Sequence, residues 1–344
     1  MEKTISALKS IIEMNDSIRE TGYPDYKLIS FCWDIVTSCQ YRCSYCYALP
    51  WLTSPKKINN SQAYKSVLSR LEMGSMPEFL IEILGGEPLL HPKIDYILER
   101  LCSNKKCQSV TVNSNGTMPF DKLFYLRERG LKVSPSYHPE YNKHPKQFCT
   151  KVMKLKQHGF VRDQLQVNIN IHNDKKYIDD YTYIVNFCAE NDILVGANYL
   201  FCTPTYTCEY TDELFQTIKR KFEALPKIPD SWDMSTDRWI GVSKYRHPRA
   251  HSVRMVGGDG GEHNISLGEI RDRELNKWKG FNCRTKFWQI DSNGLIKNEC
   301  TDEPLDMMNK NINSCIQCPN ETCGVCEVQY NFHKTAPGEK PPAN

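Results

Sequence analysis

The sequence lacks long apolar runs. None approaches the roughly 20 apolar residues that a membrane-spanning helix needs, so we expect no membrane segment. The first twenty residues, MEKTISALKSIIEMNDSIRE, are mixed in charge and lack the apolar core of a secretory signal. We therefore expect a cytoplasmic protein, whose thiols stay reduced.

The sequence also lacks a large excess of positive or negative charge. The chain has 44 Lys and Arg against 41 Asp and Glu, which gives a formal net charge of +3. This balance is well short of the basic surface of nucleic-acid-binding proteins, so nucleic acid is not indicated as a partner. An apolar fraction of 40% is ordinary for a globular protein.

Cysteine, in contrast, is abundant, with 16 residues. Because disulfides are rare in the cytosol, so many cysteines indicate metal binding by soft thiolates. Nine of them lie in two tight groups, at 39–46 and at 283–326. The scattered remainder is typical of small buried side chains: Cys32, Cys102, Cys107, Cys149, Cys188, Cys202 and Cys208.

Short β-rich segments alternate with helical patterns between residues 27 and 225. Six βα units in series predict a parallel sheet with helices outside it. Six units are too few for a closed eight-stranded barrel, so we expect an α/β fold with an open, partial (βα)6 barrel. The expected strands are 27–36, 78–85, 108–115, 131–137, 165–171 and 193–201, and apolar helical stripes cover 64–71, 94–101, 177–188 and 214–225.

The pattern changes outside this barrel region. Turn-rich text with a GGDGG sequence predicts an irregular linker that holds one β-hairpin. The last residues are rich in proline, which favours disorder. The expected segments are a helical segment at 1–26, the barrel at 27–225, the linker at 226–280, a cysteine-rich region at 281–333 and a disordered tail at 334–344.

Three cysteines fall within eight residues, spaced C-x3-C-x2-C directly after the first expected strand: Cys39, Cys43 and Cys46. A structural zinc site closes with four ligands, and a cubane [4Fe–4S] cluster takes one thiolate per iron. Three thiolates therefore leave one iron open, and a catalytic metal keeps an open position for a small molecule. A zinc site completed by His91, His138 or a distant cysteine is the alternative.

Polar residues follow the other expected strands as well. In parallel α/β proteins the active site lies at the C-terminal ends of the strands. We therefore expect these residues to gather at one edge of the sheet: GGEP at 85–88, NSNG at 113–116, Ser136 and His138, Asn170 and His172, and Cys202.

The cysteine triplet, with Tyr45 before its last member, resembles the signature of radical S-adenosylmethionine (SAM) enzymes. The resemblance covers residues 27–225. It implies a [4Fe–4S] cluster on the three cysteines, with the open iron chelated by the amino and carboxylate groups of SAM. An electron from the cluster would cleave SAM to a 5′-deoxyadenosyl radical, which takes hydrogen from a substrate. A reductant such as flavodoxin or ferredoxin would supply that electron.

Further SAM-binding residues follow from the same resemblance. GGEP resembles the family's GGE motif, so Gly85 and Gly86 would allow close backbone approach and Glu87 would accept from the SAM ammonium. NSNGT resembles the family's TNGT, so Asn115 would shape the SAM pocket. The remaining implied contacts are Tyr45 or Tyr47 at the adenine, and Ser136 and Asn170 at the carboxylate and ribose.

The second cysteine group surrounds FWQIDSNGLIKN, which predicts a β-hairpin with an Asn-Gly turn. This resembles the twitch or SPASM extensions of radical SAM enzymes, which carry auxiliary [4Fe–4S] clusters. A full SPASM pattern has seven cysteines, so one cluster, two clusters with an open site, or His333 as a stand-in ligand stay open. Zinc is a further alternative, because paired C-x2-C motifs often bind zinc. The six cysteines are Cys283, Cys300, Cys315, Cys318, Cys323 and Cys326.

The expected function is that of a radical SAM oxidoreductase or transferase acting on a peptide or protein side chain, with an auxiliary cluster. The same chemistry on a sugar, nucleoside or modified base is the second hypothesis. A non-catalytic, zinc- or cluster-stabilised binding protein is the third. Residues expected to line the substrate pocket are His138, His172, Cys202 and Tyr206.

Overall fold

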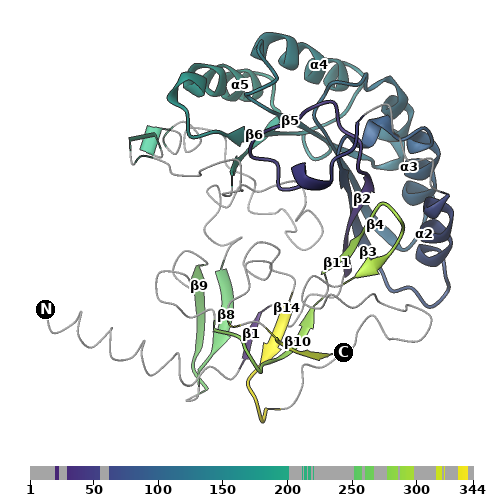
Figure 1. Ribbon diagram of the computed structural model, residues 1–344, viewed down its shortest axis with the longest axis vertical. Coiled ribbons are helices and arrows are strands. Elements are labelled where there is room, and N and C mark those ends of the chain that lie inside the picture. Colours follow the sequence, from purple (N-terminus) through teal and green to yellow (C-terminus); the bar gives the residue numbers. More distant parts are fainter. Residues whose placement is uncertain are drawn as a thin grey trace, which may run out of the picture. The chain divides into compact units, whose positions relative to one another are not determined.

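The computed structural model divides into two compact units (Figure 1). Unit 1 comprises residues 1–30, 248–289 and 295–344, and unit 2 comprises residues 31–247 and 290–294. The residues that the structure describes are 20–22, 29–54, 62–200, 211, 213–214, 216–217, 220, 252–257, 260–266, 277–285, 287–297, 315–319, 321 and 332–339.

The sheet of unit 2 follows the strand order β2-β3-β4-β5-β6-β7. Neighbouring strands from β3 to β7 pair in parallel. All six expected strands are confirmed to within two residues at each end, and the fold is α/β with a mostly parallel sheet. The strands are β2 (Ile29–Val36), β3 (Phe79–Gly85), β4 (Cys107–Ser114), β5 (Lys132–Tyr137), β6 (Gln166–Ile171) and β7 (Leu194–Tyr199).

Helices follow the strands and line one side of this sheet (Figure 1). In α3 the apolar stripe is fully buried and the helix packs against β4. Among the described residues, no helix is long and apolar enough to span a bilayer. The helices are α2 (Ala63–Leu71), α3 (Ile94–Ser103), α4 (Pro145–Gln157) and α5 (Ile178–Glu190), with 3₁₀ turns η1 (Leu49–Trp51), η2 (Pro88–Leu90), η3 (Asp121–Arg129) and η4 (Lys175–Tyr177). Most of the stripe expected at 214–225 falls outside the described residues.

The two faces of the sheet differ in chemistry, because alternate residues of a strand point to opposite faces. One face is apolar; Ile83 and Val112, for example, are completely buried. The other face is polar, since the register pairs Glu82 with Thr111, Asn113 with Ser134, and Ser136 with Asn168. In closed eight-stranded barrels, the sheet face that points into the barrel is filled with Val, Ile and Leu instead. We call it the polar face: Asp34, Glu82, Thr111, Asn113, Ser134, Ser136, Gln166, Asn168 and Asn170.

Unit 1 is built on an antiparallel sheet of order β13-β10-β14-β1-β8-β9. The hairpin expected at GGDGG is confirmed: β8 and β9 pair, and Gly257 N donates to Gly261 O at 2.9 Å. The strands are β1 (Glu20–Gly22), β8 (Ser252–Val256), β9 (Glu262–Ser266), β10 (Asn282–Thr285), β13 (Ile316–Gln317) and β14 (Phe332–Thr335).

The hairpin expected between the C-terminal cysteines is also confirmed. Its strands are β11 (Phe287–Ile290) and β12 (Ile296–Lys297). At the turn, Gly294 N donates to Asp291 O at 2.9 Å, and Gly294 adopts a φ of 79°. Such left-handed backbone is the reason that Asn-Gly turns use glycine.

Two sequence expectations are wrong in part. Residues 20–22, placed in a helical segment, form strand β1. The expected disordered tail begins inside β14, where Lys334 is completely buried. Strands β1 and β14 have three and four residues and pair with each other from opposite ends of the chain, so they leave no periodic pattern to detect.

Candidate active site

The three clustered cysteines lie on one loop, residues 37–53, which follows β2 and which we call the cysteine loop. Cys39 and Cys43 are buried and Cys46 is half-buried, and none of the three is in a disulfide. The loop is compact, since Cys46 N donates to Cys43 O at 3.1 Å. The sulfurs therefore lie at the C-terminal end of a strand, where parallel α/β proteins place their chemistry.

Arg42 closes this loop, and sequence reasoning missed it. Its Nη1 donates to the carbonyl oxygens of Cys39 and Tyr41 at 2.8 Å, and its Nη2 donates to Thr53 O at 2.7 Å. Thr53 N also donates to Thr37 O at 2.8 Å. One guanidinium thus joins the start and the end of the loop, and such charge-assisted bonds are the stronger ones.

Nitrogen groups surround the sulfurs. Tyr41 N donates to Cys39 Sγ at 3.4 Å, and Asn115 Nδ2 donates to the same sulfur at 3.6 Å. His138 Nδ1 lies 3.5 Å from Cys43 Sγ. N–H groups aimed at sulfur favour the thiolate, so the donor set fits a thiolate-bound metal centre.

Burial acts against the thiolates in the absence of a metal. It raises the pKa of Cys43 to about 12 and raises the pKa values of Cys39 and Cys46 above their usual range. A metal bound here would have to displace these protons, and its positive charge would offset that cost.

The GGE segment packs directly on the cysteine loop. Gly86 N donates to Val36 O and Glu87 N donates to Ser38 O, both at 2.8 Å. A Cβ on Gly86 would lie 2.1 Å from Ser38 O, and Gly85 adopts a φ of 120°. Glycine was expected here for close approach to SAM, and the approach that the structure shows is to the cysteine loop.

The Glu87 side chain joins the ends of β3 and β4. It is completely buried and accepts from Ser114 Oγ at 2.8 Å, Asn115 N at 2.7 Å and Leu89 N at 3.1 Å. Burial raises its pKa to about 7, against the effect of these three bonds. Two carboxylate oxygens offer about four acceptor positions, and these bonds use three of them. The bond from a SAM ammonium to Glu87, which the sequence led us to expect, stays a prediction.

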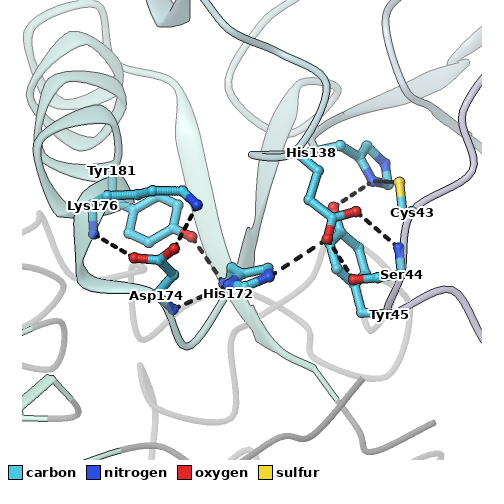
Figure 2. A network of polar contacts seen from close by, with 9 residues as sticks. Cys43, Ser44, Tyr45, His138, His172, Asp174, Lys176 and Tyr181 are labelled. Carbon is cyan, nitrogen blue, oxygen red and sulfur yellow. Dashed lines mark hydrogen bonds and ion pairs between the residues drawn. The ribbon is translucent and has the colours of Figure 1, made fainter. Parts of the chain in front are cut away.

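A polar network connects the cysteine loop to the loops after β5 and β6 (Figure 2). Cys43, Tyr45 and His138 meet at one point, where Tyr45 Oη lies 3.2 Å from His138 Nδ1. The two rings are stacked, 7° from parallel. Burial lowers the pKa of His138 to about 4, which keeps its imidazole neutral at pH 7.

Glu140 holds the centre of the same network. Its carboxylate accepts from both the backbone N, at 2.8 Å, and the hydroxyl of Ser44. Its Oε1 also lies 3.6 Å from His172 Nε2. The loop after β5 therefore anchors the middle of the cysteine loop, at Ser44, whereas Arg42 joins its two ends. No motif in the sequence marked Glu140 for this role.

The structure places the weaker predicted residues as follows. Asn170 Nδ2 lies 3.3 Å from His138 Nδ1, and Ser136 is half-buried on the polar face. His172 Nδ1 accepts from Asp174 N at 3.0 Å, and its ring meets Tyr45 edge-on.

His91, in contrast, lies away from this network: it accepts from Lys93 N and packs on Tyr64. The last two predicted pocket residues, Cys202 and Tyr206, lie outside the described residues.

The polar face continues below the cysteine loop. Asn113 Nδ2 donates to Glu82, and Asn168 Nδ2 donates to Ser134 Oγ at 2.7 Å. Burial raises the pKa of Glu82 to about 7, and the negative charge of Asp34 adds to the rise. Glu82 interrupts the apolar run EFLIEILG, which is the signal that could have identified it. A ligand seated on this face would meet carboxylates, amides and hydroxyls.

Three of the six C-terminal cysteines lie in the described part of unit 1. Cys283 and Cys318 are almost completely buried and Cys315 is half-buried. Strand β10 brings them together, since Cys283 pairs with Ile316 and Cys318 N donates to Phe281 O at 2.7 Å. Among the described residues, no three His, Cys, Asp or Glu side chains are gathered as for a single metal ion. Outside the described residues lie Cys300, Cys323 and Cys326, with the side chain of His333.

Comparisons with known proteins give matches to enzymes. The chain is 24% identical over 224 residues to GTP 3′,8-cyclase of Aquifex aeolicus (strain VF5), covering 57% of this chain and 66% of that one. It is 24% identical over 111 residues to GTP 3′,8-cyclase of Aliarcobacter butzleri (strain RM4018), covering 31% and 32%. The resemblance to radical SAM enzymes is confirmed.

A solved structure with a similar trace is Streptococcus suis SuiB bound to S-adenosylmethionine. It has a TM-score of 0.49 and 13% identity, and the match covers 83% of this chain and 65% of that chain. No family model matches the sequence. The matched part of this chain spans about one third and about two thirds of the two curated relatives.

Replacing Gly86 with alanine should destabilise unit 2 by about 3 kcal/mol, because the new Cβ would overlap Ser38 O and force the backbones apart. Gly74→Ala is the matched control, since nothing lies within 4 Å of a Cβ there. Urea unfolding of the two variants measures the difference. Equal stability of both would contradict the close packing of β3 on the cysteine loop.

The Glu82 carboxyl should make stability depend on pH. Its pKa is raised to about 7 by burial, so the folded chain binds a proton that the unfolded chain releases near pH 4.5. Glu82 should therefore contribute a fall of about 2–3 kcal/mol in the free energy of unfolding between pH 4.5 and pH 7. Glu82→Gln should remove this contribution and leave that of Glu87, whose pKa burial also raises to about 7, and the exposed control Glu78→Gln should keep the full wild-type fall. Parallel pH profiles of wild type and Glu82→Gln would rule the assignment out.

Proposed function

We propose that this chain is a radical SAM enzyme whose SAM site lies in unit 2. The observation that carries the proposal is the packing of three loops against one another at the C-terminal ends of β2, β3 and β4. These are the cysteine loop, the GGE segment and the NSNG segment, joined through Glu87 and through the contact of Asn115 with Cys39. Each of the three carries a motif that resembles a SAM-binding motif.

The roles of the residues follow from their positions. Cys39, Cys43 and Cys46 would hold a [4Fe–4S] cluster with one open iron. When bound, such a cluster would supply the electron that cleaves SAM, and the resulting radical would take a hydrogen atom from the substrate. The chain's own contribution would be the sulfur donors of the cysteine loop, the N–H groups beside Cys39, and the buried Glu87 at the neighbouring strand end. The SAM contacts proposed for this position are Tyr45, Gly85, Gly86, Glu87, Asn115, Ser136 and Asn170.

The remaining parts of the proposal concern the rest of the chain. Residues 27–225 would form the SAM-binding partial barrel, and residues 281–333 would hold one or two auxiliary iron–sulfur clusters, with zinc as the less favoured alternative. A reductant such as flavodoxin or ferredoxin and a cytoplasmic location belong to the same proposal. The buried Cys283 and Cys318 support a metal role, because soft thiolates are the ligands that zinc and iron–sulfur clusters prefer.

Two substrate classes remain under this proposal. A peptide or protein side chain follows from the SPASM-like cysteines. A nucleotide or related small polar molecule is favoured by two observations: the matched relatives are named GTP 3′,8-cyclase, and the polar face offers carboxylates, amides and hydroxyls to a ligand.

The central test is cleavage of SAM. Chain reconstituted anaerobically with iron and sulfide, then given SAM and dithionite, should produce 5′-deoxyadenosine, measured by liquid chromatography and mass spectrometry. Cys43→Ala should abolish it, because the loop then lacks one sulfur ligand. Cys102→Ala, a cysteine outside both groups, should retain it. No 5′-deoxyadenosine from a fully loaded wild-type chain would refute the proposal.

Measuring 5′-deoxyadenosine also distinguishes the two substrate classes. A true substrate should raise 5′-deoxyadenosine formation above the rate without substrate, because hydrogen transfer pulls the cleavage forward. If nucleotides are the substrates, GTP or another nucleoside triphosphate should raise the rate and deuterium from the labelled nucleotide should enter 5′-deoxyadenosine. Stimulation by peptides alone would favour the peptide class instead.

A further inference from the structure

The polar face of unit 2 contains a buried hydroxyl that the chain does not use. Thr111, on β4, is 2% exposed, and its Oγ1 has no hydrogen-bond partner in the described part of the chain. The strand register pairs Thr111 with Glu82 on β3, and paired residues of parallel strands point to the same face. Leaving a buried hydroxyl without a partner is unfavourable, so this group is available to hydrogen-bond a ligand.

Two further acceptors lie on the same face. Asn113 follows Thr111 by two residues, and its Nδ2 donates to the Glu82 carboxylate. Among the described residues, neither the Glu82 nor the Asn113 side chain makes another hydrogen bond. The second carboxylate oxygen of Glu82 and the amide oxygen of Asn113 therefore remain as acceptors. Both residues are only half-buried, so a ligand can reach them.

The charges on this face favour a ligand that donates N–H groups. Burial raises the pKa of Glu82 to about 7, the bond from Asn113 acts against the rise, and the negative charge of Asp34 adds to it. Lys132, which the register pairs with Thr111, is a cation of this face that has interactions of its own, and its charge does not act on Glu82. A donated N–H bond favours the ionised carboxylate, whereas a phosphate would be repelled by Asp34 and Glu82.

These residues lie within the reach of a small molecule from the cysteine loop. Asn115 comes directly after β4, and its Nδ2 donates to Cys39 Sγ at 3.6 Å. Because a strand rises about 3.3 Å per residue, Asn113 and Thr111 lie about 7 Å and about 13 Å before Asn115 along the strand. A ligand held by the two residues could therefore extend toward the sulfurs.

We propose that Glu82, Thr111 and Asn113 form a substrate subsite that accepts hydrogen bonds from an N–H donor group, either an ammonium or the amino-substituted edge of a nucleobase. The inference rests on the proposed function and deepens it, because it states which end of the substrate points along the polar face. The N–H-bearing end enters the subsite, and the phosphates of a nucleotide lie away from it. None of the three residues belongs to a motif that resembles a SAM-binding motif.

The test is ligand binding by the full-length chain, reconstituted anaerobically with iron and sulfide and given SAM without a reductant. Two matched pairs of probes are titrated by calorimetry. GTP is compared with inosine triphosphate, which lacks the 2-amino group, and N-acetyl-lysine amide is compared with N-acetyl-norleucine amide, which lacks the ammonium. In one pair, the amino-bearing probe should bind about 10-fold or more tightly than its partner. At pH 7 its binding should release about half a proton, because Glu82 ionises.

Variants then assign the preference to the subsite. Glu82→Gln and Thr111→Val should each reduce the preference for the amino-bearing probe about 10-fold, and Glu82→Gln should also abolish the proton release. Thr111→Val keeps the shape of the side chain and should unfold at the same or a higher urea concentration, because the lost hydroxyl had no partner in the described part of the chain. Glu78→Gln, an exposed glutamate before β3, is the control and should match the parent.

Each outcome decides the inference. A preference within the nucleotide pair assigns the subsite to a nucleobase, and a preference within the lysine pair assigns it to an ammonium. The inference is wrong if the parent shows neither preference, or if Glu82→Gln and Thr111→Val keep the preference that Glu78→Gln keeps. SAM cleavage is measured separately with a reductant. A parent chain that forms 5′-deoxyadenosine but lacks both preferences would refute the subsite alone, and one that shows a preference without cleaving SAM would refute the radical chemistry alone.

Discussion

The close approach of β3 to the cysteine loop is the constraint on which the rest of the candidate site depends. Two backbone bonds from Gly86 and Glu87 hold the loop at a distance that no side chain at position 86 would permit. From the same segment, the buried Glu87 carboxylate reaches across to Ser114 and Asn115. Asn115 in turn reaches Cys39. The first sulfur is thus positioned by a continuous series of bonds across three strand ends.

The remaining sulfurs depend on the other side of the site. Glu140, after β5, binds the backbone and side chain of Ser44, and His138 lies beside Cys43 and Tyr45. Arg42 closes the loop on itself. The cysteine loop is therefore held both by the GGE segment after β3 and by the loop after β5 in the metal-free chain. A functional site requires such preorganisation.

Sequence patterns predicted the parallel sheet of unit 2 well because every strand carries buried apolar residues on one face and every helix has an apolar stripe. The cysteine triplet and GGE could be identified because their spacing is local. Glu140 and Arg42 could not, since their roles depend on contacts to backbone that only the folded loops create. Unit 1 was harder to predict from the sequence, because β1, β8 and β14 come from distant parts of the chain. Lys334, which falls in the expected disordered tail, is one of the most deeply buried side chains.

The burial of the cysteine loop also affects the reactivity of its thiols in the metal-free chain. Oxidation and alkylation require the thiolate, and burial raises the pKa of Cys43 to about 12, so this thiol stays protonated at pH 7. Raised pKa values at Cys39 and Cys46 act in the same direction. The metal-free thiols should therefore react slowly with oxidants and alkylating agents, and a bound metal would restore the thiolates by displacing their protons.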